Sequence, residues 1–257
     1  MPIARPKIFF KFNKIDDHLF DLIRTGNFWF SAQEELNDPY DCKYSLSDEF
    51  SLKLLKKSAS HVLKDLQDRV PKLKNVNSDK FYEILLPTLK SENCMNGLYN
   101  ILFKDGLRWC VCCFTTDLKN ELMWAHYADS NKGICLEFNL SKTPELFNKI
   151  FPVEYNDQFS VINSMDDLPK ALLRKRTAWQ YEKEWRILTN VQGGKPFNKS
   201  SLTSIYFGCN VPTNKIEEIR KLMIASDYKK VNFKQFSFYI NKIKFTPLDD
   251  FPFPKKK

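Results

Sequence analysis

The feature that most constrains the fold is the alternation of short apolar runs with helical stretches, without any internal repeat. The predicted strands cover residues 8–12, 28–31, 109–115, 133–138, 151–155, 184–188 and 202–208, and a closing hairpin covers 233–245. Helices of mixed spacing interrupt these strands, which favours an α+β fold over a doubly wound one. We therefore expect a mixed, mostly antiparallel split sheet in a single domain over residues 1–257.

The predicted helices have clear boundaries in only part of the chain. A helix at 16–24 should begin at an aspartate and end at Gly26, and others are expected at 166–177 and 214–224. Between 46 and 106, apolar residues at three- and four-residue spacings predict two long helices, at 47–70 and 78–103. We expect this block to be a helical insertion that covers a sheet edge or meets a partner.

Composition excludes several classes of protein. Apolar residues make up 43% of the chain and aromatic residues 14%, which predicts a well-filled core. No apolar run approaches the roughly 20 residues that span a bilayer, and the N-terminal run is too short for a signal peptide. We expect a cytoplasmic protein without membrane contact, whose cysteines are small buried hydrophobic residues and hold no metal.

The charge points to an acidic partner but does not identify one. The formal net charge is +9, and the lysines are spread along the chain instead of forming one block. Glycine-rich phosphate-binding patterns and the serine-hydrolase pattern GxSxG are absent from the sequence.

Three segments combine polar and aromatic residues in patterns that suit chemistry. The first, Asn37-Asp38-Pro39-Tyr40-Asp41, is either a rigid turn or a turn that aims a carboxylate or amide at a ligand. The second, Trp124-Ala125-His126-Tyr127, lies on a short helix before the 133–138 strand, and either packs in the core or lines a ligand cleft.

The third segment is Tyr181-Glu182-Lys183-Glu184-Trp185-Arg186. Strand alternation would place Glu182, Glu184 and Arg186 on one face, with Trp185 and Ile187 on the other. The charged row is either a salt-bridged outer face or part of a site. A carboxylate beside an aromatic cleft suits the stabilisation of an oxocarbenium ion in glycosyl transfer.

Together these segments resemble a bacterial family known as domain of unknown function 2971. The resemblance rests on FWFSAQEELNDPYD, LMWAHYADSNKGICLEF and WQYEKEWRIL, in that order, within residues 8–42 and 108–210. More distantly, the chain is similar to ADP-ribosyltransferases, most of all to the toxins that modify DNA bases. Here a basic stretch, Arg174-Lys175-Arg176, precedes Glu184 and a short apolar strand.

The second resemblance implies an ADP-ribosyltransferase-like fold and an NAD-consuming transferase or NAD glycohydrolase, in a toxin or phage-defence role. It implies that Glu184 holds the ribose of NAD, with His126 and Tyr127 as further catalytic candidates. The residues implied around the bound NAD are Lys11, Ser31, Asn37, Asp38, Trp124 and Arg186.

Two alternatives stay open. The first is a metal-dependent nuclease, with Mg²⁺ ligands drawn from Asp38, Asp41, Glu182, Glu184 and His126. The second is a non-catalytic module of a defence system that binds nucleic acid or a partner protein through the helical insertion.

Overall fold

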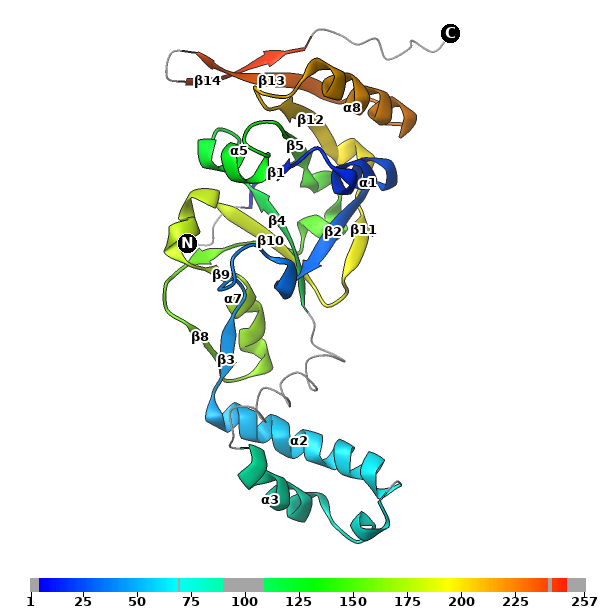
Figure 1. Cartoon of the computed structure of the whole chain (residues 1–257), viewed down its shortest axis with the longest axis vertical. Helices are drawn as coiled ribbons and strands as arrows, with labels where there is room; N and C mark the ends of the chain where they lie inside the picture. Colours follow the sequence, from blue (N-terminus) through cyan, green and yellow to red (C-terminus); the bar gives the residue numbers. More distant parts are fainter. Residues whose placement is uncertain (1–4, 69, 90–108, 240–241, 249–257) are drawn as a thin grey trace.

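The centre of the molecule is a sheet of mixed, mostly antiparallel strands (Figure 1). This computed structural model describes residues 5–68, 70–89, 109–239 and 242–248. In spatial order the strands are β11 (Gly193–Pro196), β2 (Asn27–Ala32), β4 (Cys110–Thr115), β1 (Ile8–Asn13), β5 (Ile134–Asn139), β12 (Leu202–Phe207), β13 (Asn232–Tyr239) and β14 (Lys242–Pro247). Among the described residues, β12 and β13 form the parallel pair of this sheet. The predicted α+β class and mostly antiparallel sheet are confirmed.

The sheet forks at β4. Strand β10 (Glu184–Thr189) pairs with β4 along its whole length, and β6 (Ile150–Pro152) continues the sheet beyond β10. On its other side β4 pairs with β2, and it meets β1 only through Phe10 and Thr115. On that side the sheet therefore splits between β2 and β1, and this opening positions the site described below.

Side-chain alternation along β1 places its residues in two different core clusters. Phe9 of β1 joins a large cluster with α1 (Asp17–Thr25) and α8 (Thr213–Ala225). Phe12 of the same strand joins a smaller cluster under α5 (Glu121–Tyr127), where Trp124 and Phe236 are also buried. Helices therefore cover both faces of this part of the sheet.

Helix α1 has the predicted boundaries. The Asp16 side chain accepts from the backbone N–H of Leu19, and the helix ends at Gly26 in the left-handed conformation, with φ of 66°. Strand β10, helix α8 and the β13–β14 hairpin also lie where the sequence predicts them.

Residues 48–89 form a helical pair at one end of the molecule (Figure 1). Helices α2 (Asp48–Gln67) and α3 (Ser78–Leu89) pack through Leu63 and Phe81. The remainder of the predicted second helix, residues 90–103, lies outside the described residues. The block joins the rest of the chain through β3 (Tyr44–Leu46), which pairs in parallel with β8 (Ser160–Ile162).

The helix predicted over 166–177 is wrong beyond Leu172. Helix α7 covers only Leu168–Leu172, after a 3-10 turn at Met165–Asp167. The chain then forms β9 (Arg174–Lys175), which pairs in parallel with β7 (Glu154–Tyr155). The strand pairing and the ion pairs of Lys175 outweigh the helix propensity of this basic stretch. No helix in the described part of the chain is both long and apolar enough to cross a membrane.

Candidate functional site

Residues from all three polar segments line one cavity of about 270 Å³ at the fork of the sheet. We call it the acidic cavity. Its four carboxylates come from Glu35, Asp41, Glu182 and Glu184, and Tyr127 and Asn37 contribute a phenol and an amide. Apolar walls come from Phe10, Phe12, Leu36, Phe114 and Met123. A mostly apolar cavity with a few converging polar groups is typical of a small-molecule site.

The guanidinium of Arg186 is fully buried and organises one side of the cavity. It donates two hydrogen bonds to Asp41, of 2.8 and 2.6 Å, and two to Glu184, of 2.7 and 3.0 Å. A fifth bond, of 2.8 Å, goes to the carbonyl of Leu172. Since all of its bonds go to protein groups, Arg186 positions Glu184 and has no donor left for a ligand.

Lys175 brings three of these carboxylates together. Its Nζ donates to Glu182 over 2.5 Å and to Glu184 over 3.1 Å, and it lies 3.5 Å from Asp41. Strand β9 supplies this side chain, whereas Glu184 comes from β10. The buried group therefore holds three carboxylates and two cations, which leaves one negative charge if all five are ionised.

Tyr127 links the first and third segments. Its hydroxyl donates to Glu182 Oε1 over 2.5 Å, and it accepts from the Asn37 amide over 2.9 Å. Burial, together with the negative charge of Glu182, raises the pKa of Tyr127, so the phenol remains protonated and can donate. On the other side of the cluster, the backbone N–H of Glu184 donates to the Tyr155 hydroxyl over 2.7 Å.

The two glutamates have pKa values shifted in opposite directions. Burial, followed by the charge of Glu184, raises the pKa of Glu182 above its ordinary value, although Lys175 opposes the shift. Burial would also raise the pKa of Glu184, but Arg186 and Lys175 outweigh it and lower this pKa to about 2. Glu184 therefore stays ionised at ordinary pH values, whereas Glu182 takes up a proton at a higher pH than an exposed glutamate does.

The alternation predicted for the third segment holds within β10. Glu184 and Arg186 face the polar cluster, while Trp185 and Ile187 lie in the large core cluster. Glu182 is not on the strand, because it ends the 3-10 helix Thr177–Glu182. Lys183, with φ of 46°, then turns the chain so that Glu182 faces the same cavity as Glu184.

The residues predicted around NAD do not all reach the cavity. Lys11 and Asn37 line it, and Lys11 Nζ donates to the carbonyl of Cys113 over 3.1 Å. Ser31 lies in β2, in register with Val111 of β4, and does not line the cavity. Asp38 is buried, and its Oδ1 caps the turn by accepting from the backbone N–H of Tyr40 over 2.9 Å.

Trp124 and His126 have different surroundings from Tyr127. Trp124 is fully buried against Phe12 and Phe236, so its ring faces are not open to a ligand. Its indole N–H donates to the carbonyl of Leu118 over 2.8 Å. His126 is exposed outside the cavity, with Nδ1 2.9 Å from the hydroxyl of Tyr181.

Sequence reasoning missed Lys175 and Tyr155 as members of the cluster. Lys175 lies in the basic stretch 174–176, and its role depends on a two-residue strand that periodicity does not reveal. Tyr155 accepts a hydrogen bond from the backbone N–H of Glu184. Because every residue type has this backbone group except proline, the contact cannot be predicted from a side-chain pattern. Among the described residues, no group of three or more His, Cys, Asp or Glu side chains is placed to hold a metal ion.

Comparison with known proteins bears on the second and third segments. No curated protein and no solved structure matches the chain. The family model described as "Protein of unknown function (DUF2971)" matches residues 123–187, which include Tyr127, Lys175, Glu182 and Glu184 of the cavity. The predicted resemblance to this family is therefore confirmed over Met123 to Ile187.

Proposed function

We propose that the acidic cavity binds the nicotinamide riboside part of NAD and breaks its N-glycosidic bond, in an NAD-consuming ADP-ribosyltransferase or NAD glycohydrolase. The observation that carries this proposal is that Glu182 and Glu184 line the same cavity and share Lys175, while Arg186 binds only Glu184 of the two. These charges favour opposite shifts of the two pKa values. Such a pair supplies a permanent negative charge and a proton acceptor side by side. The split of the sheet between β1 and β2 along β4 supports the fold expected from the ADP-ribosyltransferase resemblance.

Glu184 is the group suited to the bond-breaking step. The C1′–N bond breaks with its electron pair going to nicotinamide, which leaves as a neutral molecule, and positive charge develops on the ribose. A carboxylate that stays ionised and is fixed by Arg186 can stabilise this charge without reorganisation. Arg186 is therefore a positioning residue in this proposal, and not a contact of the pyrophosphate.

Glu182 is the group suited to the bond-forming step. An acceptor hydroxyl or water attacks C1′ and gives its proton to the Glu182 carboxylate, which later releases it to solvent. The raised pKa of Glu182 brings it closer to the range in which a general base works well. Tyr127 orients the carboxylate through its hydrogen bond to Oε1.

The size of the cavity limits what it encloses. At about 270 Å³ it lies just below the roughly 300–1,000 Å³ of sites that enclose whole drug-sized ligands. The nicotinamide riboside would occupy it, while the rest of NAD would extend outside. Lys11 lines the cavity and has ammonium hydrogens beyond the one given to Cys113, so it is the cation we assign to the nearer phosphate.

The test is nicotinamide release from NAD by the purified protein, followed by chromatography. We expect the natural chain to release nicotinamide. The variant Glu182→Gln and the double variant with both Tyr127→Phe and Glu182→Gln should release it more slowly, by about 100-fold or more. The matched control is Glu137→Gln. Glu137 also accepts from a tyrosine, Tyr206, over 2.6 Å, but does not line the cavity.

Absence of nicotinamide release by the natural chain would overturn the proposal, and so would either of two further results. The first is equal nicotinamide release by the natural chain and by Glu182→Gln, because the signal would then come from another source. The second is chelator-sensitive cleavage of a nucleic acid without NAD, which would favour the metal-dependent nuclease instead.

A further inference from the structure

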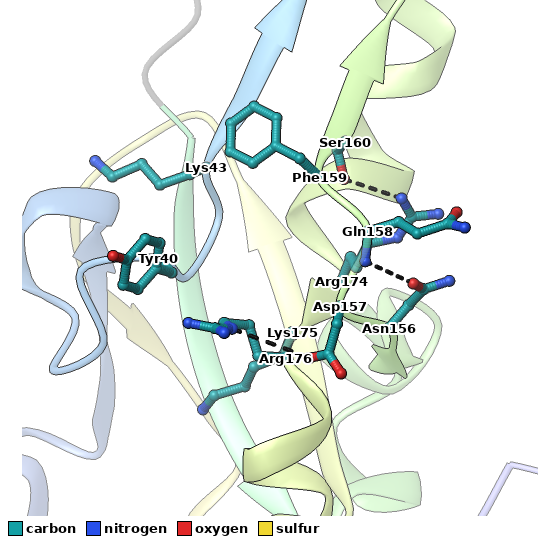
Figure 2. A pocket seen from close by; sticks show the side chains of 10 residues that line it. All are labelled: Tyr40, Lys43, Asn156, Asp157, Gln158, Phe159, Ser160, Arg174, Lys175 and Arg176. Atoms are coloured by element: carbon teal, nitrogen blue, oxygen red, sulfur yellow. Dashed lines mark hydrogen bonds and ion pairs between the residues drawn. The ribbon is translucent and has the colours of Figure 1, made fainter.

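A second pocket, of about 310 Å³, lies next to the acidic cavity and shares Lys175 with it. Figure 2 shows Tyr40 and Lys43 on one side of this pocket and Phe159 and Arg174 further across it, with Arg176 near its centre. We call it the basic–aromatic pocket. Neither the resemblances nor the proposed reaction assigns it a ligand.

The charges in the basic–aromatic pocket favour an anionic ligand. Lys43, Arg174 and Arg176 line it together with one carboxylate, Asp157. The ion pair between Arg176 Nε and Asp157 is long, at 4.0 Å, and both side chains are exposed. Within the described part of the chain Lys43 forms no ion pair, so its ammonium group and the Arg176 guanidinium are the donors open to a ligand. Arg174 already donates to the Ser160 hydroxyl over 3.3 Å and lies 3.9 Å from Glu154. Cationic donors are therefore available here, whereas those of the acidic cluster are occupied.

Two aromatic rings add a surface for flat, uncharged groups. Tyr40 is 63% exposed and Phe159 is 59% exposed, although both are large and line a concave surface. The Arg176 guanidinium lies 4.9 Å from the centre of the Tyr40 ring, so it can stack there and still donate outward. Exposed aromatic rings among cations are the arrangement with which proteins bind single strands, by base stacking and phosphate contacts.

We propose that the basic–aromatic pocket binds a segment of single-stranded nucleic acid, with phosphates on Lys43 and Arg176 and a base stacked on Tyr40 or Phe159. The openness of the pocket favours a polymer over a free nucleotide. Small ligands are usually buried over most of their surface, and rings more than half exposed cannot enclose one. A single strand of nucleic acid gains affinity from contacts to many phosphates, so an open surface is sufficient to bind it.

The position of the pocket suggests why a strand would bind there. Lys175 lies between the two pockets, with its ammonium group bound to the carboxylates of the acidic cavity. A strand in the basic–aromatic pocket would therefore lie beside that cavity. That it serves as the acceptor of the transferred group rests on the proposed function, whereas the binding itself does not.

The experiment measures fluorescence anisotropy of a labelled single-stranded oligonucleotide of mixed sequence, as DNA and as RNA, with the full chain and without NAD. We expect saturable binding that weakens with salt, and about tenfold weaker binding by Tyr40→Ala or Phe159→Ala. Lys43→Ala should lower the slope of log affinity against log salt by about 0.7, the value for one phosphate contact on a single strand.

Matched controls separate the pocket from general surface charge. Trp29→Ala removes a ring that is 54% exposed on β2, and Arg24→Ala removes an exposed guanidinium that lies 5.7 Å from the Phe20 ring on α1. Both should leave binding unchanged.

Equal weakening by these controls, equal affinity for duplex, or full displacement by ADP at comparable concentration would each overturn the proposal. Strand binding without NAD consumption would overturn only the proposed function, and the reverse result only this inference.

Discussion

Arg186 and Asp41, which lie 145 positions apart in the chain, are joined by two hydrogen bonds of 2.8 and 2.6 Å. Both side chains are buried, with exposed fractions of 0% and 2%. This pair fixes the turn-rich segment 37–43 against β10, so the acidic cavity depends on it for its shape.

The first prediction concerns stability. Asp41→Ala should lower the free energy of unfolding by about 3–5 kcal/mol, because it leaves part of the buried Arg186 charge without its partner. The control is Asp21→Ala, which removes an exposed ion pair with Arg24 and should cost less than about 1 kcal/mol. Chemical denaturation measures both, and similar small losses in the two variants would contradict the structural role given to Asp41.

The second prediction concerns the pH dependence of stability. Folding lowers the pKa of Glu184 from 4.5 to about 2, so its contribution is present above pH 4.5 and is lost as the pH falls towards 2. The contribution amounts to about 3 kcal/mol, since each pKa unit corresponds to about 1.4 kcal/mol. Unfolding free energies measured across this range should therefore fall less steeply in Glu184→Gln than in the natural chain.

Glu182 provides the control with the opposite sign. Folding raises its pKa, so its contribution is present at low pH and is lost as the pH rises through the raised value. As the pH rises above 4.5, the natural chain should therefore lose stability relative to Glu182→Gln. Parallel curves for all three proteins would show that neither shift exists.

The third prediction concerns the pH dependence of nicotinamide release and depends on the proposed function. The hydrogen bond from Tyr127 lowers the pKa of Glu182, so Tyr127→Phe should raise it further. As a general base Glu182 must be ionised, and the acid limb of kcat/KM should move to higher pH in this variant. Tyr206→Phe, which removes the equivalent bond to Glu137, should leave the limb in place. A limb that stays fixed in Tyr127→Phe would remove Glu182 as the base.

The fourth prediction concerns the turn between α5 and β5. A Cβ on Gly133 would lie 2.3 Å from the carbonyl oxygen of Asn13 and 2.8 Å from Ala128 Cα, and both are backbone atoms. Gly133→Ala should therefore lower the free energy of unfolding by about 1–3 kcal/mol. In the control Gly194→Ala, the new Cβ would meet only the Asn27 side chain, at 3.2 Å, so a smaller loss is expected.

The sequence predicted those parts of the fold and site that depend on local pattern. Alternation along β10 placed Glu184 and Arg186 opposite Trp185, and the Asx-Pro turn marked the segment that carries Asn37 and Asp41. These features follow from the two-residue period of strands and from turn chemistry, and both depend only on residues that are neighbours in the sequence.

The remaining features depend on contacts between distant segments. Lys175 belongs to the cluster only because β9 pairs with β7 and faces β10. The separation of Trp124 from Tyr127, one in the core and one at the cavity, depends on how far α5 is rotated against β1. The basic–aromatic pocket combines residues that precede β3, residues around the start of β8 and residues in and just after β9. No single stretch of the sequence therefore predicts it.

The two hydrogen bonds between Arg186 and Asp41 also have a consequence for how this chain can vary. It anchors the backbone just before β3, the strand through which the helical pair is attached. Sequence grafted or deleted beyond that anchor should leave the carboxylates undisturbed. The architecture is thus modular at this point, because the helical pair can change in length or sequence without altering the acidic cavity behind the anchor.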